Sequence, residues 1–232
     1  MHFECKIFRL NYFIPIRPNK FNLQITPLSV ALIQPQFAPN LYDLTAMLRA
    51  DRVIFMDTDP WSRKGRTHRA KIRSKVGHEW INVPIKTVDK DLSIFEVRIN
   101  HNELWFTPFW NGILHNYSNA TWFDYFHDEL LALFENSATT QKLIDFNMQI
   151  FTHLCRLLEI HIKVEWMSET EVFDIQAQPI IQEYASRNYI RQWPNNIGVE
   201  LPGNLIVDPE CSIIDLLLTN GPESFRVLDL LK

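Results

Sequence analysis

The chain has 232 residues, of which 46% are hydrophobic and 22% charged, so it is long and apolar enough for one globular domain with a sizeable core. The net charge of −4 argues against general nucleic-acid binding, and six Gly against sixteen Phe and seven Trp disfavour glycine-loop nucleotide folds. The three cysteines are far apart and show no CxxC spacing, which favours a reducing, cytoplasmic location.

Residues 1–27 are predicted to be an N-terminal extension. Basic residues interrupt its short apolar pieces and no small-residue cleavage site follows, so it is a poor signal peptide. Two interpretations stay open, an extra strand or arm packed on the domain, or a start codon assigned too far upstream. Residues 28–232 are predicted to form a single α/β domain, in which no run approaches the roughly 18 apolar residues of a membrane span.

The domain is predicted to begin with a strand, a helix and a second strand. Val30–Ile33 and Val53–Met56 are short continuous apolar runs, as expected for strands buried on both faces. Between them, Asn40 can cap a helix whose apolar residues recur at helical spacing until about Ala50. This βαβ unit predicts parallel strands and a right-handed crossover.

Polar side chains follow both predicted strands, Gln34 and Gln36 after the first, Asp57 and Asp59 after the second. Ligands tend to bind outside the carboxyl ends of the strands of an open parallel sheet. The two aspartates can act as a general base, bind a sugar hydroxyl or help hold a divalent metal; alternatively they only cap and turn the chain. Gln34 must satisfy its amide, either by tying down the loop or by contacting a ligand.

The densest positive charge in the chain follows these aspartates, with seven Lys and Arg between Arg63 and Lys75. From Thr67 onward, Arg69 and Lys71 alternate with apolar neighbours, which predicts a strand with a basic face. This face indicates an anion site, with Arg69 as the best candidate because it lies nearest the βαβ turns in sequence. The alternative is a solvated edge that charge keeps from pairing with other chains.

The rest of the chain completes a predicted α/β fold: a mixed, partly parallel sheet built on the N-terminal βαβ unit, with a largely helical second half. Further strands are expected at 79–86, 93–100 and 160–166. Helices are expected at about 107–117, 122–135, 139–158, 169–185 and after Ser212, with an interruption at Pro179.

Other site classes have little support in the sequence. It contains no HExxH, Cys/His cluster, G-x-S-x-G elbow or P-loop, so no metal site is predicted and the cofactor stays unknown. Cys155 and Cys211 make poor nucleophiles, and Ser212 fits a helix cap better than a nucleophile. Trp105 and Tyr117 are candidates for stacking on a sugar.

The ordered set of motifs resembles the WbqC-like proteins encoded in bacterial surface-polysaccharide (O-antigen) gene clusters, from about Ser29 to Ser224. Family members open with an apolar strand into Gln-Pro and an aromatic-Pro loop, then a helix, a strand ending in acidic residues and a basic segment. The corresponding stretches here are 33–39, 53–57, 67–72, the Trp-led 80–85 and the closing 211–217 and 220–223.

The resemblance implies an enzyme of surface-glycan biosynthesis and suggests acyl or aminoacyl transfer to a nucleotide-linked sugar. The expected binding partner is such a sugar or another anionic small molecule. The candidate catalytic residues are Asp57 and Gln34; the candidate substrate-binding residues are Arg69, Lys71, His68, Gln36 and Asp59. Departures from the family's pattern at Gln36 and Thr58 weaken a carboxylate-pair mechanism. The alternative is a non-catalytic partner of a glycan assembly enzyme, and a homo-oligomer stays open.

Overall fold

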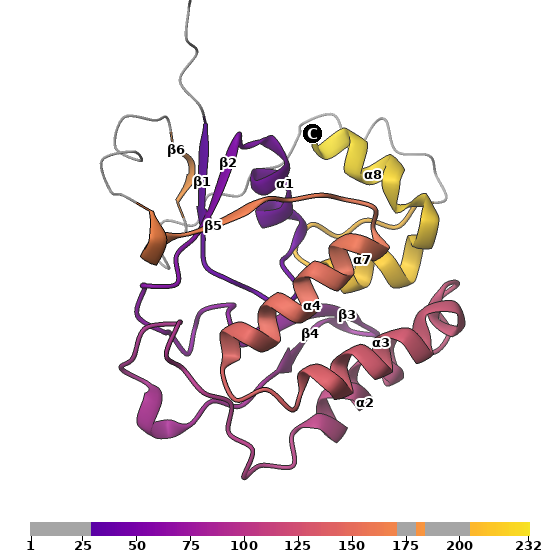
Figure 1. Cartoon of the computed structure of the whole chain (residues 1–232). Coiled ribbons are helices and arrows are strands. Elements are labelled where there is room, and N and C mark those ends of the chain that lie inside the picture. Colours follow the sequence, from indigo (N-terminus) through magenta and orange to yellow (C-terminus); the bar gives the residue numbers. More distant parts are fainter. Residues whose placement is uncertain (1–28, 171–179, 184–204) are drawn as a thin grey trace, which may run out of the picture.

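The computed structural model describes residues 29–170, 180–183 and 205–232, with the backbone alone for 180–183 (Figure 1). The predicted extension 1–27, and with it the choice between its two interpretations, lies outside these ranges. So does most of the region between the end of the predicted strand at 160–166 and the last helices.

A four-stranded parallel sheet has the order β5-β2-β1-β6 and confirms the predicted βαβ unit. Strand β1 (Val30–Ile33) pairs with β2 (Arg52–Phe55), residue 30 opposite 52 and 33 opposite 55. The outer strands are β5 (Val164–Trp166) and β6 (Ile180–Glu183). The apolar runs of β1 and β2 are buried, as expected for the two central strands of a parallel sheet.

The expected helix at 169–185 is wrong at residues 180–183, because these form β6. The β-branched pair Ile180 and Ile181 suits a strand, and Pro179, directly before it in the sequence, disfavours continuation of a helix. These residues pair with the edge of β1 that faces away from β2, and no local pattern in the sequence indicates that this edge is available for pairing.

Helix α1 (Leu41–Arg49) connects β1 and β2 and begins as predicted. The Asn40 side chain accepts a hydrogen bond of 2.9 Å from the backbone N–H of Asp43. The apolar residues of α1 pack into two cores, Leu41 and Leu44 into the main one and Met47 against the parallel sheet. The helix therefore joins the sheet to the rest of the domain.

Strands β3 (Arg69–Ser74) and β4 (Gly77–Asn82) form a separate antiparallel hairpin (Figure 1). The predicted alternation is confirmed, since Ala70, Ile72 and Ile81 are buried while the basic side chains of β3 face outward. Gly77 has a φ of +126°, a left-handed conformation that glycine adopts at little cost. Helices α2 and α7, described below, contact the inner face of the hairpin.

The predicted strand at 93–100 is wrong, because this segment makes only isolated bridges at Ser93, Arg98 and Ile99. Its backbone N–H groups bond to separate partners: that of residue 95 donates to Asp57, that of residue 99 to Gln141 and that of residue 100 to Pro84. The alternation of apolar residues is real and buries Val97 and Ile99, but no single neighbouring strand runs beside it.

The second half is largely helical, as predicted. Its helices are α2 (Phe106–Tyr117), α3 (Phe123–Ser137), α4 (Leu143–Leu157), α7 (Ile213–Asn220) and α8 (Ser224–Leu231), with short 3-10 turns η1 (Thr87–Asp89), η2 (Met167–Glu169) and η3 (Gly221–Glu223). In the described part of the chain, no helix is long and apolar enough to cross a membrane.

Aromatic side chains fill the main core between these helices and the hairpin. Phe37, in the loop after β1, packs edge-on against Phe146 of α4, with 5.4 Å between ring centroids. Tyr117 is 2% exposed, which excludes it as a sugar-stacking group, and Trp105 packs against Phe146 in the same core. Helix α7 ends before Gly221, which has a φ of +51° and whose added Cβ would lie 2.2 Å from the Trp122 ring.

Candidate functional site

Asp57, the residue placed first among the catalytic candidates, lies at the carboxyl end of β2 and is buried. One carboxylate oxygen accepts a hydrogen bond of 3.0 Å from the backbone N–H of Ser168, and the other accepts one of 2.6 Å from the Ser168 hydroxyl. Ser168 belongs to η2, directly after β5. Asp57 therefore ties together two neighbouring strand ends, which is the capping role weighed for it from the sequence.

Gln34, at the end of β1, is buried and reaches the loop that follows β2. Its Nε2 donates a hydrogen bond of 2.9 Å to Oδ2 of Asp59. Its Oε1 faces Gly65, where an added Cβ would lie 3.6 Å away. The amide thus ties down the surrounding loops, and it brings two of the predicted site residues into direct contact.

Gln36 belongs to a different group of residues, at the start of α1. Its Nε2 donates a hydrogen bond of 2.8 Å to Oδ2 of Asp43, a carboxylate that is fully buried in the first turn of the helix. Arg66 Nη1 lies 3.8 Å from the same oxygen. A buried carboxylate is stabilised here by a guanidinium group and by the positive end of the helix dipole.

Arg69 and Lys71 project from the basic face of β3 onto Trp80 of β4. The Arg69 guanidinium lies 4.2 Å from the centroid of the Trp80 ring, and it donates hydrogen bonds of 2.8 and 2.7 Å to the carbonyls of Gly65 and Lys64. Lys71, which is opposite Trp80 in the register, has its Nζ 2.6 Å from Oε2 of Glu210. The hairpin therefore holds both the loop before it and the loop before α7.

The first turns of α1 and α7 meet beside this face, so two helix N-termini lie together. Asn40 and Ser212 form an isolated antiparallel bridge. The backbone N–H of Ser212 donates to the carbonyl of Lys71 over 2.8 Å. Ser212 occupies the predicted cap position of α7 but makes no capping bond with its side chain; its buried hydroxyl has no hydrogen-bond partner among the described residues.

A small cavity of about 10 Å³ opens where these elements converge, and Gln36, Arg69 and Lys71 line it. We call it and its surroundings the hairpin site, defined by the lining side chains Gln36, Asn40, Arg66, Arg69, Lys71, Trp80 and Glu210. Three of the seven predicted site residues therefore come together. Asp57, Gln34, Asp59 and His68 do not line this cavity.

His68 is buried, and its ring packs edge-on against Trp61 with 5.0 Å between centroids. Burial, together with the positive charges of Arg69 and Arg63, lowers the pKa of His68 from 6.5 to about 4. The imidazole is therefore neutral at neutral pH. It adds no positive charge to a site for an anion.

Asn147, which was not among the predicted site residues, connects the loops around the site from α4. Its buried Nδ2 donates hydrogen bonds to the carbonyl of Pro35, over 3.1 Å, and to that of Thr67, over 2.8 Å. In sequence it is one polar residue on an otherwise apolar helix face. A buried amide at such a position is the signal that could have drawn attention to it.

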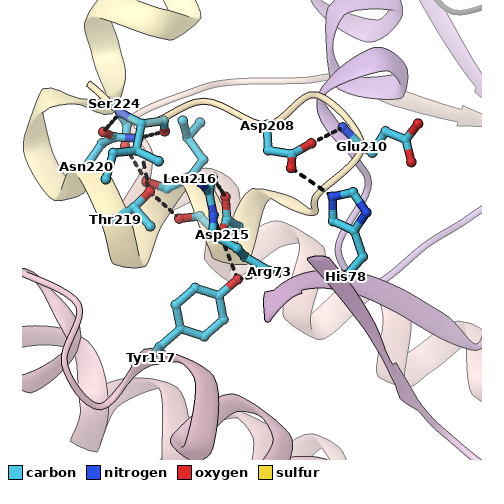
Figure 2. A network of polar contacts seen from close by, with 11 residues as sticks. Arg73, His78, Tyr117, Asp208, Glu210, Asp215, Leu216, Thr219, Asn220 and Ser224 are labelled. Atoms are coloured by element: carbon cyan, nitrogen blue, oxygen red, sulfur yellow. Dashed lines mark hydrogen bonds and ion pairs between the residues drawn. The ribbon is translucent and has the colours of Figure 1, made fainter. Parts of the chain in front are cut away.

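Arg73, the last basic residue of β3, is partly exposed and forms a network with the buried side chains of Asp215 and Tyr117 (Figure 2). Its guanidinium donates to both oxygens of Asp215, over 3.2 and 2.9 Å, and its backbone N–H donates to the Tyr117 hydroxyl. That hydroxyl donates to Asp215 over 2.7 Å. Burial and the nearby carboxylate raise the pKa of Tyr117, so the phenol stays protonated.

These features define an α/β protein in which a basic antiparallel hairpin covers the loops and helix N-termini beside a small parallel sheet. A family model, described as the WbqC-like protein family, matches residues 34–195. The chain belongs to the WbqC-like protein family, which confirms the resemblance read from the sequence.

A curated relative is similar over most of the chain. It is the "Uncharacterized protein Rv1507c" of Mycobacterium tuberculosis (strain ATCC 25618 / H37Rv), 25% identical over 226 residues that cover 84% of this chain and 95% of the relative. No solved structure matches the chain.

Proposed function

We propose that this protein acts in bacterial surface-glycan biosynthesis and binds the phosphate groups of a nucleotide-linked sugar, or another small anion, at the hairpin site. Family membership supports the pathway. The observation that carries the ligand class is the convergence of Arg66, Arg69 and Lys71 beside the N-termini of two helices. Guanidinium groups and helix N-termini both favour phosphate.

Binding requires the site to open, because a cavity of about 10 Å³ holds no more than one water molecule. The Lys71–Glu210 pair is the contact that can open, since both side chains are partly exposed. A phosphate would replace the Glu210 carboxylate as the partner of Lys71. Arg69 is already fixed on the Trp80 ring, so little of its conformational entropy is lost on binding.

The proposed reaction is acyl or aminoacyl transfer to a hydroxyl or amino group of the sugar, with Asp57 and Gln34 as the catalytic residues. Asp57 would accept the proton of the attacking group while the acyl carbon forms its new bond and loses the donor's leaving group. To do so it must exchange the hydrogen bond from the Ser168 hydroxyl for one from the sugar. Asp59 and His68 would lie on the sugar side of the phosphate groups.

Asp57→Asn tests this role with little change in structure. The amide oxygen can still accept from the Ser168 N–H, and the amide nitrogen can donate to the Ser168 hydroxyl, so both contacts survive. We expect a wild-type melting temperature with loss of glycan modification in a complementation assay. Full complementation by Asp57→Asn would show that Asp57 is not catalytic, and it would leave the proposal of an anion site unaffected.

The anion site is tested by Arg69→Ala, with Lys75→Ala as the matched control. Lys75 carries the same charge on the exposed hairpin turn. We expect calorimetric titration with nucleotide sugars to show at least about tenfold weaker binding for Arg69→Ala, as for loss of a charge-assisted hydrogen bond, and little change for Lys75→Ala. Equal losses of affinity in the two variants would mean that the ligand is held by general charge attraction and not by a specific site at Arg69.

A second candidate function is a non-catalytic partner of a glycan assembly enzyme. It is favoured by the contacts of the buried polar groups: Asp57 and Asp43 both accept internal hydrogen bonds, and burial raises the pKa of the Cys155 thiol to about 12. None of these three groups therefore offers an activated nucleophile. This function requires stable co-purification with a pathway protein, and a monomer that turns over a nucleotide sugar alone would contradict it.

A further inference from the structure

A second polar cluster lies at the tip of the hairpin, outside the residues used above. His78, directly after the turn of β4, points toward Asp208 in the loop that precedes α7 (Figure 2). Its Nε2 is 2.8 Å from Oδ2 of Asp208. Cys211, three residues further along the same loop, is fully buried. The ligand atoms of the three residues all lie within 4.8 Å of one another.

We propose that His78, Asp208 and Cys211 bind a divalent transition-metal ion, zinc in preference to others, through imidazole, carboxylate and thiolate. Nitrogen, oxygen and sulfur ligands of this kind are those that Zn²⁺ takes in proteins. Three protein ligands leave the fourth tetrahedral position for water or for an anionic group of a ligand. The site adjoins the hairpin site through Glu210, but it does not depend on the function proposed for that site.

The distances suit a tetrahedral ion. Metal–ligand bonds of about 2.0 to 2.3 Å place ligand atoms roughly 3.3 to 3.8 Å apart. No two ligand atoms of the cluster are more than 4.8 Å apart, so none of these separations must shrink by more than roughly 1.5 Å, whereas the hydrogen bond between His78 and Asp208 must open by about 0.5 Å. We expect side-chain rotations to supply these shifts.

The backbone already holds two of the ligands in place. The N–H of Cys211 donates to the carbonyl of Asp208 over 3.1 Å, which closes a turn, and Oδ1 of Asp208 accepts from the N–H of Glu210, also over 3.1 Å. The second carboxylate oxygen of Asp208 is therefore the one directed at His78. Helix α7 begins directly after this turn and anchors it in the core.

The charges around the cluster permit a cation. The nearest positive groups are compensated, Arg73 by Asp215 and Lys71 by Glu210. Asp208 and a Cys211 thiolate together neutralise a divalent ion. Burial, and then the charges of Asp215 and Asp208, raise the pKa of the Cys211 thiol, so binding of the ion through sulfur must release the thiol proton to solvent.

The sequence did not predict this site because His78 is 130 positions from Asp208 and further still from Cys211, and the three residues match no known metal-binding spacing. The simpler explanation is a hydrogen bond between His78 and Asp208 above an inert buried thiol. The two explanations differ in one property, namely direct bonding of sulfur to the metal.

Cobalt substitution tests that property on the full-length chain, without a histidine tag and stripped with a chelator. Titration with Co²⁺ should give one equivalent of tetrahedral d–d absorption and a thiolate-to-cobalt charge-transfer band, and Zn²⁺ should abolish both. A cobalt spectrum without the thiolate band, or without saturation at one equivalent, would overturn the site.

Variants then assign the ligands. Cys211→Ser should lose the charge-transfer band and His78→Gln should retain it, and in both the zinc affinity, measured against a chromophoric chelator, should fall by at least about tenfold. The matched control is Cys155→Ser, which removes the other described buried thiol and should change neither property. If Cys211→Ser fails to fold, the exposed His78→Gln still decides, because unchanged zinc affinity in that variant contradicts the proposal.

Discussion

The polar side chains at the carboxyl ends of β1 and β2 are more completely buried and hydrogen-bonded within the fold than those on the basic face of the hairpin. At the strand ends, Asp57 and Gln34 are buried and each is bonded to another element of the fold. On the hairpin, Lys71 is partly exposed, and its Nζ is paired with the Glu210 carboxylate and lies 5.3 Å from the centroid of the Trp80 ring. The polar residues at the strand ends thus hold parts of the fold together, whereas the ion pair of Lys71 is one that we propose a ligand can replace.

Asp57→Ala should produce the largest change in stability, because it removes both acceptors of Ser168 inside the fold. Bonds to a buried carboxylate predict a loss of about 2 to 3 kcal/mol in the free energy of unfolding. Urea denaturation of this variant, of Ser168→Ala and of the double variant gives the coupling energy between the two residues. A loss below about 0.5 kcal/mol would mean that Asp57 does not hold β2 to β5.

The pH dependence of the unfolding free energy tests whether His68 is buried and neutral. Its pKa is about 4 in the fold against an ordinary value of 6.5, so the unfolded chain binds the proton first as pH falls, and stability drops between these two values. From about pH 7 to pH 5 the loss should be roughly 2 kcal/mol. His68→Leu removes the group, and its unfolding free energy should vary less over this range by about that amount. Parallel curves for the two proteins would contradict a buried neutral imidazole.

Arg69→Ala should change stability less than it changes binding. Its hydrogen bonds go to the backbone of a partly exposed loop, and its stacking on Trp80 is worth about 0.5 to 1 kcal/mol at such sites. We expect a loss of about 1 kcal/mol in urea denaturation, alongside the weaker nucleotide-sugar binding described above. A loss as large as that of Asp57→Ala would place Arg69 with the structural residues and remove the contrast between the two regions.

Much of the fold could be predicted because its signals are local. The apolar runs of β1 and β2, the Asn40 cap and the alternation in β3 each depend on neighbours within a few residues. The failures depended on distant partners. The segment at 93–100 has the pattern of a strand but no adjacent strand, and residues 180–183 become a strand because the edge of β1 accepts them.

The site was predicted less completely than the fold. The alternation in the sequence correctly predicted that Arg69 and Lys71 share one outward face of β3. We also assigned Asp57 to their site, but its carboxylate accepts a hydrogen bond from Ser168, which is 111 residues away in the sequence. Glu210 and Asn147 also reach the site from far along the chain. Whether a polar residue is saturated depends on such remote partners, and no spacing rule in the sequence reveals them.

Glu210→Gln should have the smallest effect on stability and a diagnostic effect on binding. It removes an ion pair between partly exposed side chains, which is worth less than about 1 kcal/mol. Because Lys71 loses a competing carboxylate, anion affinity should rise, most clearly at low salt. Glu79→Gln, which neutralises a carboxylate elsewhere on β4, is the matched control in titrations with inorganic phosphate and with nucleotide sugars. A fall in phosphate affinity in Glu210→Gln, or an equal rise in Glu79→Gln, would mean that Lys71 does not exchange its carboxylate partner for the ligand. The basic side chains of the hairpin would then be as fully committed to the fold as the polar groups at the strand ends.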